Sequence, residues 1–590
     1  MLTKKQFSVL ADVATHPKES QRARAQRIGV SLGSVNAAMR QLKENGLVDE
    51  VGAVTQRGID ELAPYKVDNA IIMAAGLSSR FAPISYERPK GMLRVRGEVL
   101  IERQIRQLKE AGIDDITVVV GYMKELFFYL EEQFGVKIRV NEEYAHRNNN
   151  STLMLVREKL GNTYICSSDN YFTQNVFEPY VFEAYYSAVY FEGPTDEYLL
   201  HTGAGKRIVD VTIGGADAYG MSGHAYFDRA YSRVFRQILE REYDRPETAS
   251  KLWEDIYIAH LDELSMVMRA YEPGIIYEFD SLEEIGDFDP AFIENVDSSI
   301  LDNICRTLDV ERGDVRGIEP ISQGLTNLSF KFEVPSGSYV YRHPGAGTDA
   351  IISRAAETFS QHIAADLGLD DTFVFEDPEQ GWKISRYLPS CTELDYHDKA
   401  QVAEALGMAR TLHRCGKESQ WSFDVYEKAK EIIALLDERH RASYADFKQL
   451  LELIDGLARY VANDGTQPCL CHNDFYSPNL LVQDGKMYLI DWEYSGMSDY
   501  ASDLGTFVCC SDYGIDETLE VLAEYFQRPP TGAELAHCLS FIAISSYYWF
   551  VWALYKDACG APVGEWLYLW YKNAKLFGNE ARRAIDALSV

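Results

Sequence analysis

Apolar strands alternate with amphipathic helices from about residue 68, and this pattern constrains the fold more than any other feature of the 590-residue chain. "NAIIMAAG" is a continuous apolar strand, "LIERQIRQLKEAG" has apolar residues at helical spacing, and "DDITVVVGY" is a second apolar strand. Strands that are apolar along their whole length are typical of a parallel sheet with helices on both faces. We therefore expect a Rossmann-like α/β domain, with a mainly parallel sheet, over residues 67–295.

Segments with a different texture lie on both sides of this domain, as expected for a chain too long for one hydrophobic core. Residues 1–66 read as short helices and a small hairpin, with Asn45-Gly46 ending a helix. After residue 295, "ISQGLTNLSFKFEV" and "SYVYRHPG" indicate antiparallel strands, and the chain beyond about 395 is mostly helical. The sequence predicts a multidomain α/β and α+β protein whose last domain, 296–590, has a sheet-rich lobe and a helical lobe.

The first segment resembles a winged helix-turn-helix, with the helix from Ser34 to Glu44 in the recognition position. Over residues 1–66, Lys and Arg exceed Asp and Glu by 10 − 7 = +3, whereas the whole chain carries −32. Such a module can bind DNA, and it can equally serve docking or dimerisation. The sequence leaves these alternatives, and the oligomeric state, open.

Charge and cysteine content restrict the remaining function classes. A net charge of −32 disfavours nucleic acid as the main partner, because neutralising phosphates needs clustered Lys and Arg. The ten cysteines include no second pair at zinc-ligand spacing, so reduced thiols are expected. No long apolar run follows the N-terminal lysines, and the apolar stretch 541–555 is too short to span a bilayer. We expect a cytoplasmic protein that does not insert into a membrane.

A small-residue turn follows the first apolar strand in "IIMAAGLSSRF". Small side chains let backbone N–H groups approach a triphosphate, and Arg80 and Lys90, the latter in "ERPKGML", can meet its negative charge. A second apolar strand, "YICSSDNYF", leads to Asp169, where a divalent metal would be held beside phosphates. The alternative is an ordinary strand-to-helix turn with a surface arginine. The candidate nucleotide-binding residues in the turn are Ala74, Ala75, Gly76, Ser78 and Ser79.

These motifs resemble the sugar-nucleotide-type nucleotidyltransferases, and most closely the CTP:phosphocholine cytidylyltransferases, over about residues 68–290. The resemblance implies a second metal carboxylate at Asp280, in "YEFDSLEEI". It further implies Mg²⁺ held by Asp169 and Asp280, with Arg80 and Lys90 stabilising the triphosphate of CTP as pyrophosphate leaves. No protein nucleophile is required.

The stretch "LWEDIYI" supplies a candidate site for the acceptor of the nucleotidyl group. Trp253, Asp255 and Tyr257 combine aromatic faces with a carboxylate, which a quaternary ammonium group prefers. The alternative is an amphipathic helix that uses its tryptophan as core.

A second set of motifs, "HNDFYSPNLL" followed by "YLIDWEYSG", resembles the catalytic and metal-binding loops of the aminoglycoside-phosphotransferase and choline-kinase superfamily. The resemblance implies a two-lobed, protein-kinase-like fold. Asp474 would orient or deprotonate the acceptor hydroxyl, while Asn479 and Asp491 would hold Mg²⁺ on the phosphates of ATP. His472 is expected to support the loop rather than to transfer a proton.

The strands upstream are expected to cover the nucleotide. In "QGLTNLSFKF", Gly324, Thr326 and Asn327 are candidates for a loop over the phosphates. Arg342 occupies the place of the lysine of protein kinases, and Glu357 is its expected partner, with a surface salt bridge as the alternative.

Aromatic residues near the metal motif suggest the kind of acceptor. Aromatic faces with a carboxylate attract a trimethylammonium group through cation–π and Coulomb interactions, although each ring can instead be core. The candidate acceptor-binding residues are Trp492, Glu493, Tyr494, Trp549 and Trp552.

The two sets of motifs point to consecutive reactions. We expect an enzyme that phosphorylates choline with ATP and transfers a cytidylyl group from CTP to phosphocholine, with Mg²⁺ in both sites. The alternatives are ethanolamine or another amino alcohol, a sugar kinase joined to a sugar-phosphate nucleotidyltransferase, and a ligand-sensing transcriptional regulator with enzyme-like domains.

Overall fold

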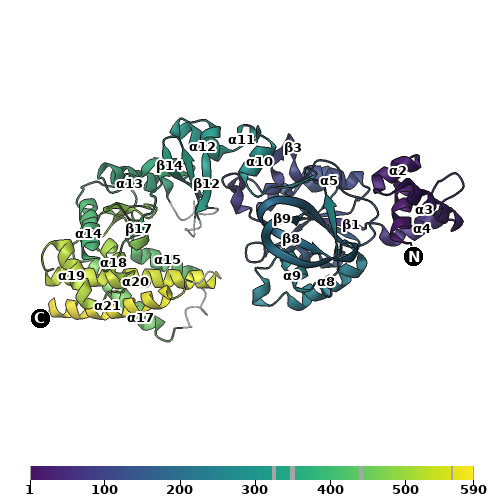
Figure 1. Ribbon diagram of the computed structural model, residues 1–590. Coiled ribbons are helices and arrows are strands. Elements are labelled where there is room, and N and C mark those ends of the chain that lie inside the picture. The colour runs from purple at the N-terminus through teal and green to yellow at the C-terminus, as the bar shows by residue number, and fades with distance from the viewer. Residues whose placement is uncertain (1, 322–326, 346–352, 437–443, 560–562, 589–590) are drawn as a thin grey trace. The chain divides into compact units, whose positions relative to one another are not determined.

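A computed structural model describes residues 2–321, 327–345, 353–436, 444–559 and 563–588. The chain forms two compact units, Met1–Arg306 and Thr307–Val590 (Figure 1). Residues 1–66 belong to the first unit together with the expected nucleotidyltransferase domain. The division into three domains at 66 and 295 stays a prediction.

The N-terminal module contains α1 (Lys4–Thr15), α2 (Gln21–Ile28), α3 (Leu32–Glu44) and α4 (Gln56–Leu62) around a small core. The expected recognition helix begins at Leu32 rather than Ser34, because the Ser31 side chain accepts a hydrogen bond from the Ser34 N–H and caps the helix. The expected hairpin is reduced to one bridge between Val48 and Val54. A winged helix and DNA binding therefore stay predictions.

The module is joined to the sheet domain through polar and aromatic contacts. The backbone N–H of Val181 donates to the Tyr65 carbonyl at 2.9 Å, and Lys66 forms a bridge with Tyr180. The Tyr65 ring stacks on Phe182 with 5.4 Å between ring centroids. The junction is part of the packed structure of the first unit.

A seven-stranded sheet forms the centre of the first unit, in the order β10-β8-β9-β6-β1-β4-β5. The neighbours β6, β1, β4 and β5 are parallel, and β9 pairs antiparallel with β6 and β8. Alternate residues of β1 face two different cores, with Ile71 in one and Ala70 and Ile72 in the other. This confirms the predicted mainly parallel sheet. Its strands are β1 (Asn69–Ala74), β4 (Ile116–Val120), β5 (Lys137–Val140), β6 (Thr163–Ser167), β8 (Tyr185–Thr202), β9 (Ile208–Phe227) and β10 (Val267–Tyr271).

Shorter elements complete the first unit. Two small antiparallel pairs are formed by β2 (Arg94–Val95) with β3 (Glu98–Val99) and by β7 (Asn170–Phe172) with β11 (Ile276–Glu278). The helices are α5 (Leu100–Glu110), α6 (Tyr129–Phe134), α7 (Asn150–Leu155), α8 (Arg229–Glu242), α9 (Trp253–Ala259), α10 (Leu282–Phe288), α11 (Phe292–Asn295) and α12 (Ser299–Leu308).

The second unit begins with a five-stranded antiparallel sheet in the order β12-β13-β14-β16-β15. Helix α13 (Arg354–Asp366) comes between β14 and β15 in sequence. Its strands are β12 (Arg316–Ile321), β13 (Asn327–Val334), β14 (Gly337–Pro344), β15 (Phe373–Glu376) and β16 (Lys383–Arg386). The sheet followed by a helical lobe confirms the predicted two-lobed architecture.

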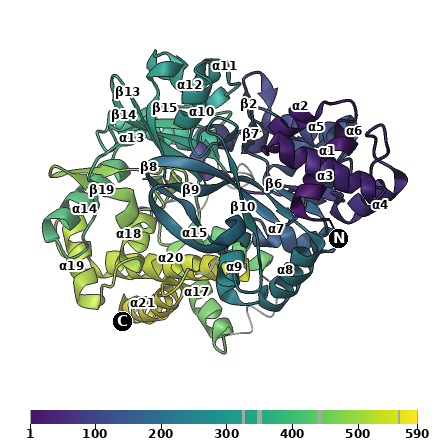
Figure 2. The same ribbon diagram turned by 45° about the vertical axis from the view of Figure 1, so that its right-hand side comes forward.

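The helical lobe contains two long helices that lie side by side, α20 (Gly532–Ala558) and α21 (Trp566–Leu588) (Figure 2). Around them lie α14 (Lys399–His413), α15 (Val425–Leu435), α17 (Phe447–Val461), α18 (Tyr500–Cys509) and α19 (Ile515–Phe526). Short strands carry the functional loops: β17 (Thr392–Glu393), β18 (Cys469–Cys471), β19 (Leu480–Gln483), β20 (Lys486–Leu489) and β21 (Gly496–Ser498).

Helix α20 corrects one argument from the sequence. The apolar stretch 541–555 lies within a helix of 27 residues, which is long and apolar enough to cross a membrane by length and composition. Length therefore does not exclude a span. In this structure 83% of the most apolar window of α20 is buried inside the protein, as in a core helix.

Candidate active sites

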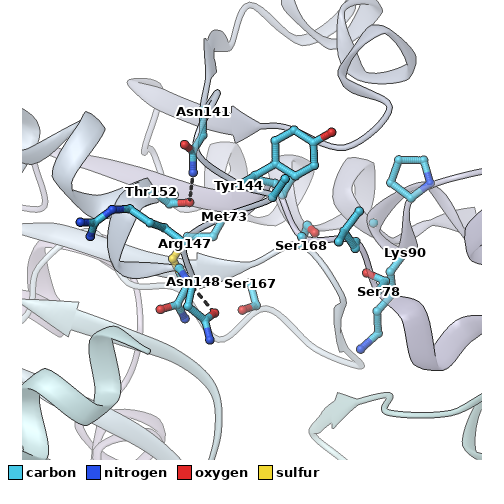
Figure 3. Close-up of a pocket in the computed structure, with 18 of the residues that line it drawn as sticks. Met73, Ser78, Lys90, Asn141, Tyr144, Arg147, Asn148, Thr152, Ser167 and Ser168 are labelled. Carbon is cyan, nitrogen blue, oxygen red and sulfur yellow. Dashed lines mark hydrogen bonds between the residues drawn. The ribbon is translucent and has the colours of Figure 1, made fainter. Parts of the chain in front are cut away.

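The first site lies where β1 and β6 end side by side. The turn after β1 and Asp169 after β6 border a cavity of about 610 Å³. Figure 3 shows Ser78, Lys90 and Ser168 on one side of this cavity and Asn141 and Arg147 on the other. The predicted residues Ala74, Ala75, Gly76 and Ser78 line it, while Ser79 begins a short 3-10 helix. The opposite wall was not predicted, because its residues, from 141–149, Thr152 of α7 and 249–250, carry no recognisable motif.

Lys90 and Asp169 form the polar centre of this site. Nζ of Lys90 lies 2.8 Å from Oδ2 of Asp169, and it also lies 4.5 Å above the Phe81 ring. The second carboxylate oxygen, Oδ1 of Asp169, is buried and has no hydrogen-bond partner among the described residues. A buried carboxylate oxygen without a partner is the ligand that a divalent cation requires. The donor set therefore fits the expected metal.

Arg80 and Asp280 form a second pair, with Nη2 of Arg80 3.1 Å from Oδ1 of Asp280. Asp280 also lines a second cavity of about 490 Å³. This cavity is mainly acidic and aromatic: it is lined by Glu197, Glu278, Asp280, Glu284 and Asp287, by Phe191, Tyr277, Phe279 and Phe288, and by Arg96, whose guanidinium lies over the Phe288 ring. Carboxylates and aromatic faces together favour a cationic ligand.

Glu278 lies between the ion pair of Lys90 with Asp169 and the ion pair of Arg80 with Asp280. The backbone N–H of Gly223 donates to its Oε2 at 3.0 Å. The Glu278 side chain is exposed to the cavity, and desolvation by the nearby protein together with the charge of Asp169 raises its pKa to about 8. The sequence motif identified Asp280, two residues later, and missed this carboxylate.

The structure corrects the acceptor site expected in "LWEDIYI". Trp253 and Tyr257 are 1% and 0% exposed and pack in the core against Phe227, Phe235 and Tyr231. Their rings are enclosed by side chains, so the core alternative is correct for both. Asp255 accepts hydrogen bonds from the Leu252 N–H and the Tyr198 hydroxyl.

Glu254, which lies between Trp253 and Asp255 in sequence, makes two side-chain hydrogen bonds. It accepts hydrogen bonds from the Tyr186 hydroxyl at 3.1 Å and from Nδ2 of Asn149 at 3.2 Å. Burial raises the pKa of Glu254 to about 7. Burial, and then the charges of Glu254 and Glu278, raise the pKa of the Tyr186 hydroxyl.

The second site is built on the loop after β18. His472 is fully buried, and its Nε2 lies 2.9 Å from the Ile490 carbonyl, while the Asp474 N–H donates to its Nδ1 at 3.3 Å. Burial lowers the pKa of His472. A neutral ring with both nitrogens engaged matches the expected supporting role.

Asp474 and Asn479 lie in contact, as the loop spacing predicts. Nδ2 of Asn479 donates to Oδ2 of Asp474 at 2.8 Å and to its carbonyl at 2.9 Å. Oδ1 of Asp474 is buried without a hydrogen-bond partner among the described residues. Burial and the charge of Asp491 raise the pKa of Asp474 well above its usual range. A carboxylate with a raised pKa has a raised affinity for a proton.

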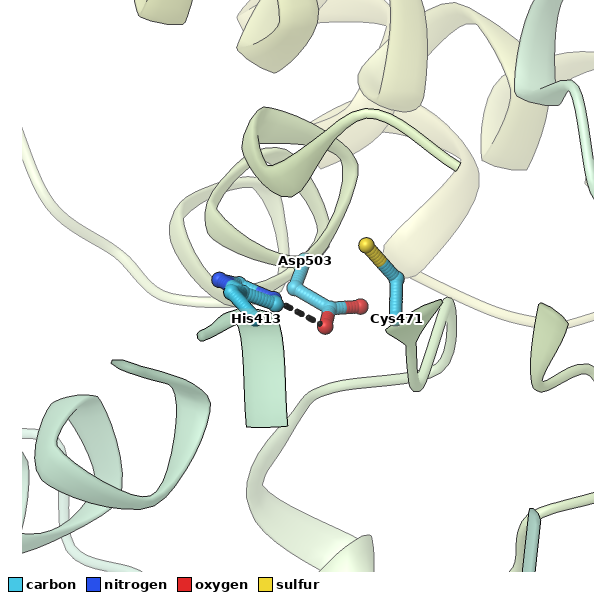
Figure 4. A group of neighbouring side chains, drawn as sticks. All are labelled: His413, Cys471 and Asp503. Carbon is cyan, nitrogen blue, oxygen red and sulfur yellow. Dashed lines mark hydrogen bonds and ion pairs between the residues drawn. The ribbon is translucent and has the colours of Figure 1, made fainter. Parts of the chain in front are cut away.

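Asp503 of α18 holds this loop in place, and the sequence analysis assigned it no role. It accepts hydrogen bonds from the backbone N–H groups of His472 at 2.9 Å and Asn473 at 2.6 Å. Nε2 of His413 lies 2.8 Å from the same carboxylate, with Cys471 beside the pair (Figure 4). Because both Asp503 oxygens already accept hydrogen bonds, this cluster is a support for the loop rather than a metal centre.

Arg342 of β14 forms the ion pair expected with Glu357 of α13. Nη1 of Arg342 lies 2.6 Å from Oε1 of Glu357 and 3.6 Å from Oδ1 of Asp491. Burial raises the pKa of Glu357, but the charges of Arg342 and Lys383 outweigh burial and lower it. Glu376, 3.3 Å from Nη2 of Arg342, was missed because it lies on a separate strand. Because Glu357 is completely buried, the surface salt-bridge alternative is wrong.

Part of the expected nucleotide loop lies outside the described residues. Gly324 and Thr326 are among these undescribed positions, and Asn327 is the first residue of β13. Their roles in covering a nucleotide stay predictions.

The aromatic candidates of the second site differ in their exposure. Trp492 is 0% exposed, its indole N–H donates to the Leu489 carbonyl at 3.0 Å, and its ring lies 4.7 Å from that of His472. The expectation that Trp492 contacts the acceptor is therefore wrong, because the ring packs beneath the loop. Glu493 is also buried, with Oε2 3.9 Å from Nη1 of Arg354.

A second group of aromatic residues lies near Asp474, and it contains both partly exposed rings and buried ones, Tyr548 and Trp570. The Trp549 ring lies 6.5 Å from Tyr476, 5.6 Å from Trp552 and 5.7 Å from Trp570. Burial and then the charge of Asp474 raise the pKa of Tyr476 and of Tyr548. We call Tyr476, Tyr494, Tyr548, Trp549, Trp552 and Trp570 the aromatic wall; the sequence pattern indicated Tyr494 and the residues of α20 but missed Tyr476 and Trp570.

Comparison with known families agrees with the geometry of both sites. A family model described as "MobA-like NTP transferase domain" matches residues 70–181, and one described as "Phosphotransferase enzyme family" matches residues 317–537. The first match covers the turn after β1 and Asp169. The second covers Arg342, the loop with Asp474 and Asp503.

Individual relatives also match only one part of this chain each. A choline-phosphate cytidylyltransferase of Streptococcus pneumoniae is 35% identical over 215 residues, which are 36% of this chain and 94% of the relative. A 2-aminoethylphosphonate cytidylyltransferase of Lancefieldella rimae is 34% identical over 229 residues, 38% of this chain and 93% of the relative. The crystal structure of a choline kinase, LicA from Streptococcus pneumoniae, is 25% identical, covers 48% of this chain and 98% of that chain, and has a TM-score of 0.41.

Proposed function

The chain belongs to the choline-phosphate cytidylyltransferase family, and we propose from this premise that it makes CDP-choline in two steps. The second unit phosphorylates choline with ATP, and the first unit transfers the cytidylyl group of CTP to the resulting phosphocholine. The observation that carries the proposal is the presence of two separate acidic sites, one around Asp169 and one around Asp474. A regulator that only senses ligand has no need of both.

In the first reaction, the choline hydroxyl attacks the γ-phosphorus of ATP. The new O–P bond forms as the bond to the β-phosphate oxygen breaks, ADP leaves, and Asp474 takes the hydroxyl proton. The raised pKa of Asp474 suits this role, because the carboxylate is prepared to bind a proton. Arg342, held by Glu357, faces the metal residue Asp491 and would meet the nucleotide phosphates.

In the second reaction, a phosphate oxygen of phosphocholine attacks the α-phosphorus of CTP, and pyrophosphate leaves. Lys90 and Arg80 stabilise the negative charge that develops on the triphosphate. Both cations are held by carboxylates, Lys90 by Asp169 and Arg80 by Asp280, so they are oriented before the substrate arrives.

Magnesium fits both sites. Asp169 with Asp280, and Asn479 with Asp491, would hold Mg²⁺, which when bound supplies positive charge to phosphate oxygens. The buried oxygen of Asp169 that has no partner among the described residues supports this assignment in the first site.

Each acceptor site offers a place for a trimethylammonium group. For choline it is the aromatic wall near Asp474. For phosphocholine it is the 490 Å³ cavity, where the carboxylates of Glu197 and Glu278 lie among aromatic rings, next to Asp280. This cavity replaces Trp253 and Tyr257 as the proposed acceptor site.

The second candidate acceptor is a primary ammonium compound, either phosphoethanolamine or 2-aminoethylphosphonate. The carboxylates of the acidic cavity favour it, because they can accept hydrogen bonds from an ammonium group. A phosphonate, however, needs no phosphorylation, so the second unit would have no part in its activation.

The test is phosphorus NMR of the full chain with ATP, CTP, Mg²⁺ and one acceptor: choline, ethanolamine or 2-aminoethylphosphonate. We expect choline to yield CDP-choline, Asp474→Asn to block phosphocholine formation, and Asp169→Asn to accumulate phosphocholine. CDP-ethanolamine from ethanolamine alone, or a CMP-phosphonate formed without ATP, would replace choline by the corresponding acceptor. No product from any acceptor would overturn the enzymatic proposal.

A further inference from the structure

The loop that carries Lys90 is held at both ends by one later segment of the chain. The loop runs from residue 87 to residue 96, and the segment, which we call the connecting segment, runs from residue 288 to residue 300. The connecting segment leads directly into α12, which ends at Leu308, beyond the start of the second unit at Thr307. The two pieces are far apart in sequence and are joined by side chains rather than by a sheet.

Glu87 makes the contact at the beginning of the loop. Its Oε1 accepts hydrogen bonds from the backbone N–H groups of Ser299 at 2.7 Å and Ile300 at 3.3 Å, and from the Ser299 hydroxyl at 2.6 Å. Its Oε2 accepts a hydrogen bond from the hydroxyl of Ser298, a residue that is 1% exposed. A carboxylate at the first N–H groups of a helix is also favoured by the helix dipole. Glu87 therefore caps α12 from outside the helix.

Arg96 makes the contact at the end of the loop. Its backbone N–H donates to Oδ2 of Asp289 at 2.7 Å, and Nη2 donates to the Phe288 carbonyl at 2.8 Å. The guanidinium lies 3.7 Å above the Phe288 ring. Arg88 adds a third contact, 3.0 Å from Asp297.

Lys90 lies between these contacts and is nearly buried. Its backbone carbonyl accepts a hydrogen bond from Leu93 at 3.0 Å, and its Nζ reaches Asp169. The position of this ammonium group therefore depends on a loop whose ends are fastened to the connecting segment.

We propose that Glu87 and Arg96 are positioning residues for cytidylyl transfer, and that the connecting segment acts through them as a clamp on the Lys90 loop. This rests on the proposed function, because it assigns to Lys90 the binding of the CTP triphosphate. The last part of the first unit, before the second begins at Thr307, then supports the first active site.

The test compares variants of the full chain. Glu87→Ala removes the carboxylate from the start of α12, where the Ser298 hydroxyl still accepts a hydrogen bond from the Leu301 N–H, and Glu87→Gln keeps an oxygen for the Ser299 and Ile300 N–H groups. Asp228→Ala is the matched control, because Asp228 caps α8 in the same unit by accepting hydrogen bonds from Ala230 and Tyr231. We expect Glu87→Ala to weaken CTP binding, measured by calorimetry, about tenfold, and Glu87→Gln to restore most of the affinity. Asp228→Ala should lower the unfolding midpoint about as much as Glu87→Ala does, but it should leave the CTP affinity unchanged.

A double-mutant cycle with Lys90→Ala separates positioning from general stability. In the Lys90→Ala background, Glu87→Ala should weaken CTP binding by less than about twofold, because the group it positions is gone. Equal losses from Glu87→Ala and Asp228→Ala, or the full loss in both backgrounds, would overturn the clamp. If the wild-type chain does not bind CTP, it is the proposed function that fails. Phosphorylation of choline, carried out by the other unit, should be the same in all these variants.

Discussion

The carboxylate of Asp503 accepts a hydrogen bond from the backbone N–H of His472 at 2.9 Å, which fixes the loop that carries Asp474. We expect Asp503→Asn to lower kcat for choline phosphorylation about 10- to 100-fold, because an amide cannot accept the His472, Asn473 and His413 hydrogen bonds together. The KM values for ATP and choline should change little, and initial-rate kinetics will show this. Asp484→Asn, at an exposed turn of the same lobe, is the control. An Asp503→Asn enzyme with wild-type kcat would refute the supporting role.

The acidic cavity predicts a pH effect on the cytidylyl-transfer step. The pKa of Glu278 is raised to about 8, so the carboxylate gains its negative charge as the pH rises from 7 to 9. A charged carboxylate attracts the trimethylammonium group, and the KM for phosphocholine should therefore fall over this range. In Glu278→Gln the fall should be absent, while the KM for CTP follows the wild-type profile. A pH profile for phosphocholine that Glu278→Gln leaves intact would place the acceptor elsewhere.

The aromatic wall predicts a selective loss of choline affinity. We expect Trp549→Leu to raise the KM for choline about 5- to 30-fold, since a cation–π contact contributes about 1–2 kcal/mol when desolvated. The KM for ATP should not change. Tyr568→Leu, at an exposed position of α21, serves as the control. With 3,3-dimethylbutanol, a neutral analogue of choline, Trp549→Leu should have much less effect; an equal effect would show that shape, and not charge, is recognised.

His537 of α20 predicts a pH-dependent contribution to stability. Its side chain is 4% exposed, its Nδ1 contacts Asp464, and its Nε2 lies 2.8 Å from Oδ1 of Asp499. Burial lowers the pKa of His537, but the two aspartates outweigh burial and raise it. A raised folded-state pKa means that the stabilisation is complete below the unfolded value, about 6.5, and is lost as the pH rises through the folded value.

We therefore expect His537→Gln to lower the free energy of unfolding by roughly 2 kcal/mol at pH 6 and by less at pH 9. Hydrogen exchange of α20 peptides in the full chain, measured at both pH values, gives the comparison. A difference that grows with pH would mean that His537 is neutral in the folded protein.

Trp253 tests the boundary between core and ligand site. We expect Trp253→Ala to destabilise the first unit by about 3–5 kcal/mol, because a large ring is removed from a closed core. Trp253→Phe should keep the fold and the KM for phosphocholine. If Trp253→Phe instead raised that KM without changing the urea midpoint, the indole would be contacting the substrate.

Motifs local in sequence predicted the parts of each site that are close along the chain. Asp474 and Asn479 share one loop, and Asp491 follows the hairpin of β19 and β20, so spacing alone brings them together. The Arg342 and Glu357 pair follows from the order of strand and helix. The parallel sheet could be predicted because strands buried on both faces must be apolar throughout.

Contacts between segments that are far apart in sequence could not be predicted from local sequence patterns. A carboxylate such as Asp503, Glu278 or Glu87 has the same side chain on a surface as in a site, and only the folded chain shows what it meets. Similarly, Trp253 and Trp492 lie beside acidic residues in sequence, as in an aromatic site for a quaternary ammonium group. Their rings nevertheless pack in the core.

The sequence by itself determined the two chemistries, because catalysis by phosphate-binding turns and metal carboxylates needs given residue types at short, fixed spacings. Only the tertiary structure decided which aromatic residues line a cavity and which carboxylates form ion pairs with Lys90 and Arg80. It also decided that the connecting segment contacts both ends of the Lys90 loop. The physical reason is that burial and charge are properties of a neighbourhood, and the neighbours of a side chain come from segments whose distance along the chain no local pattern records.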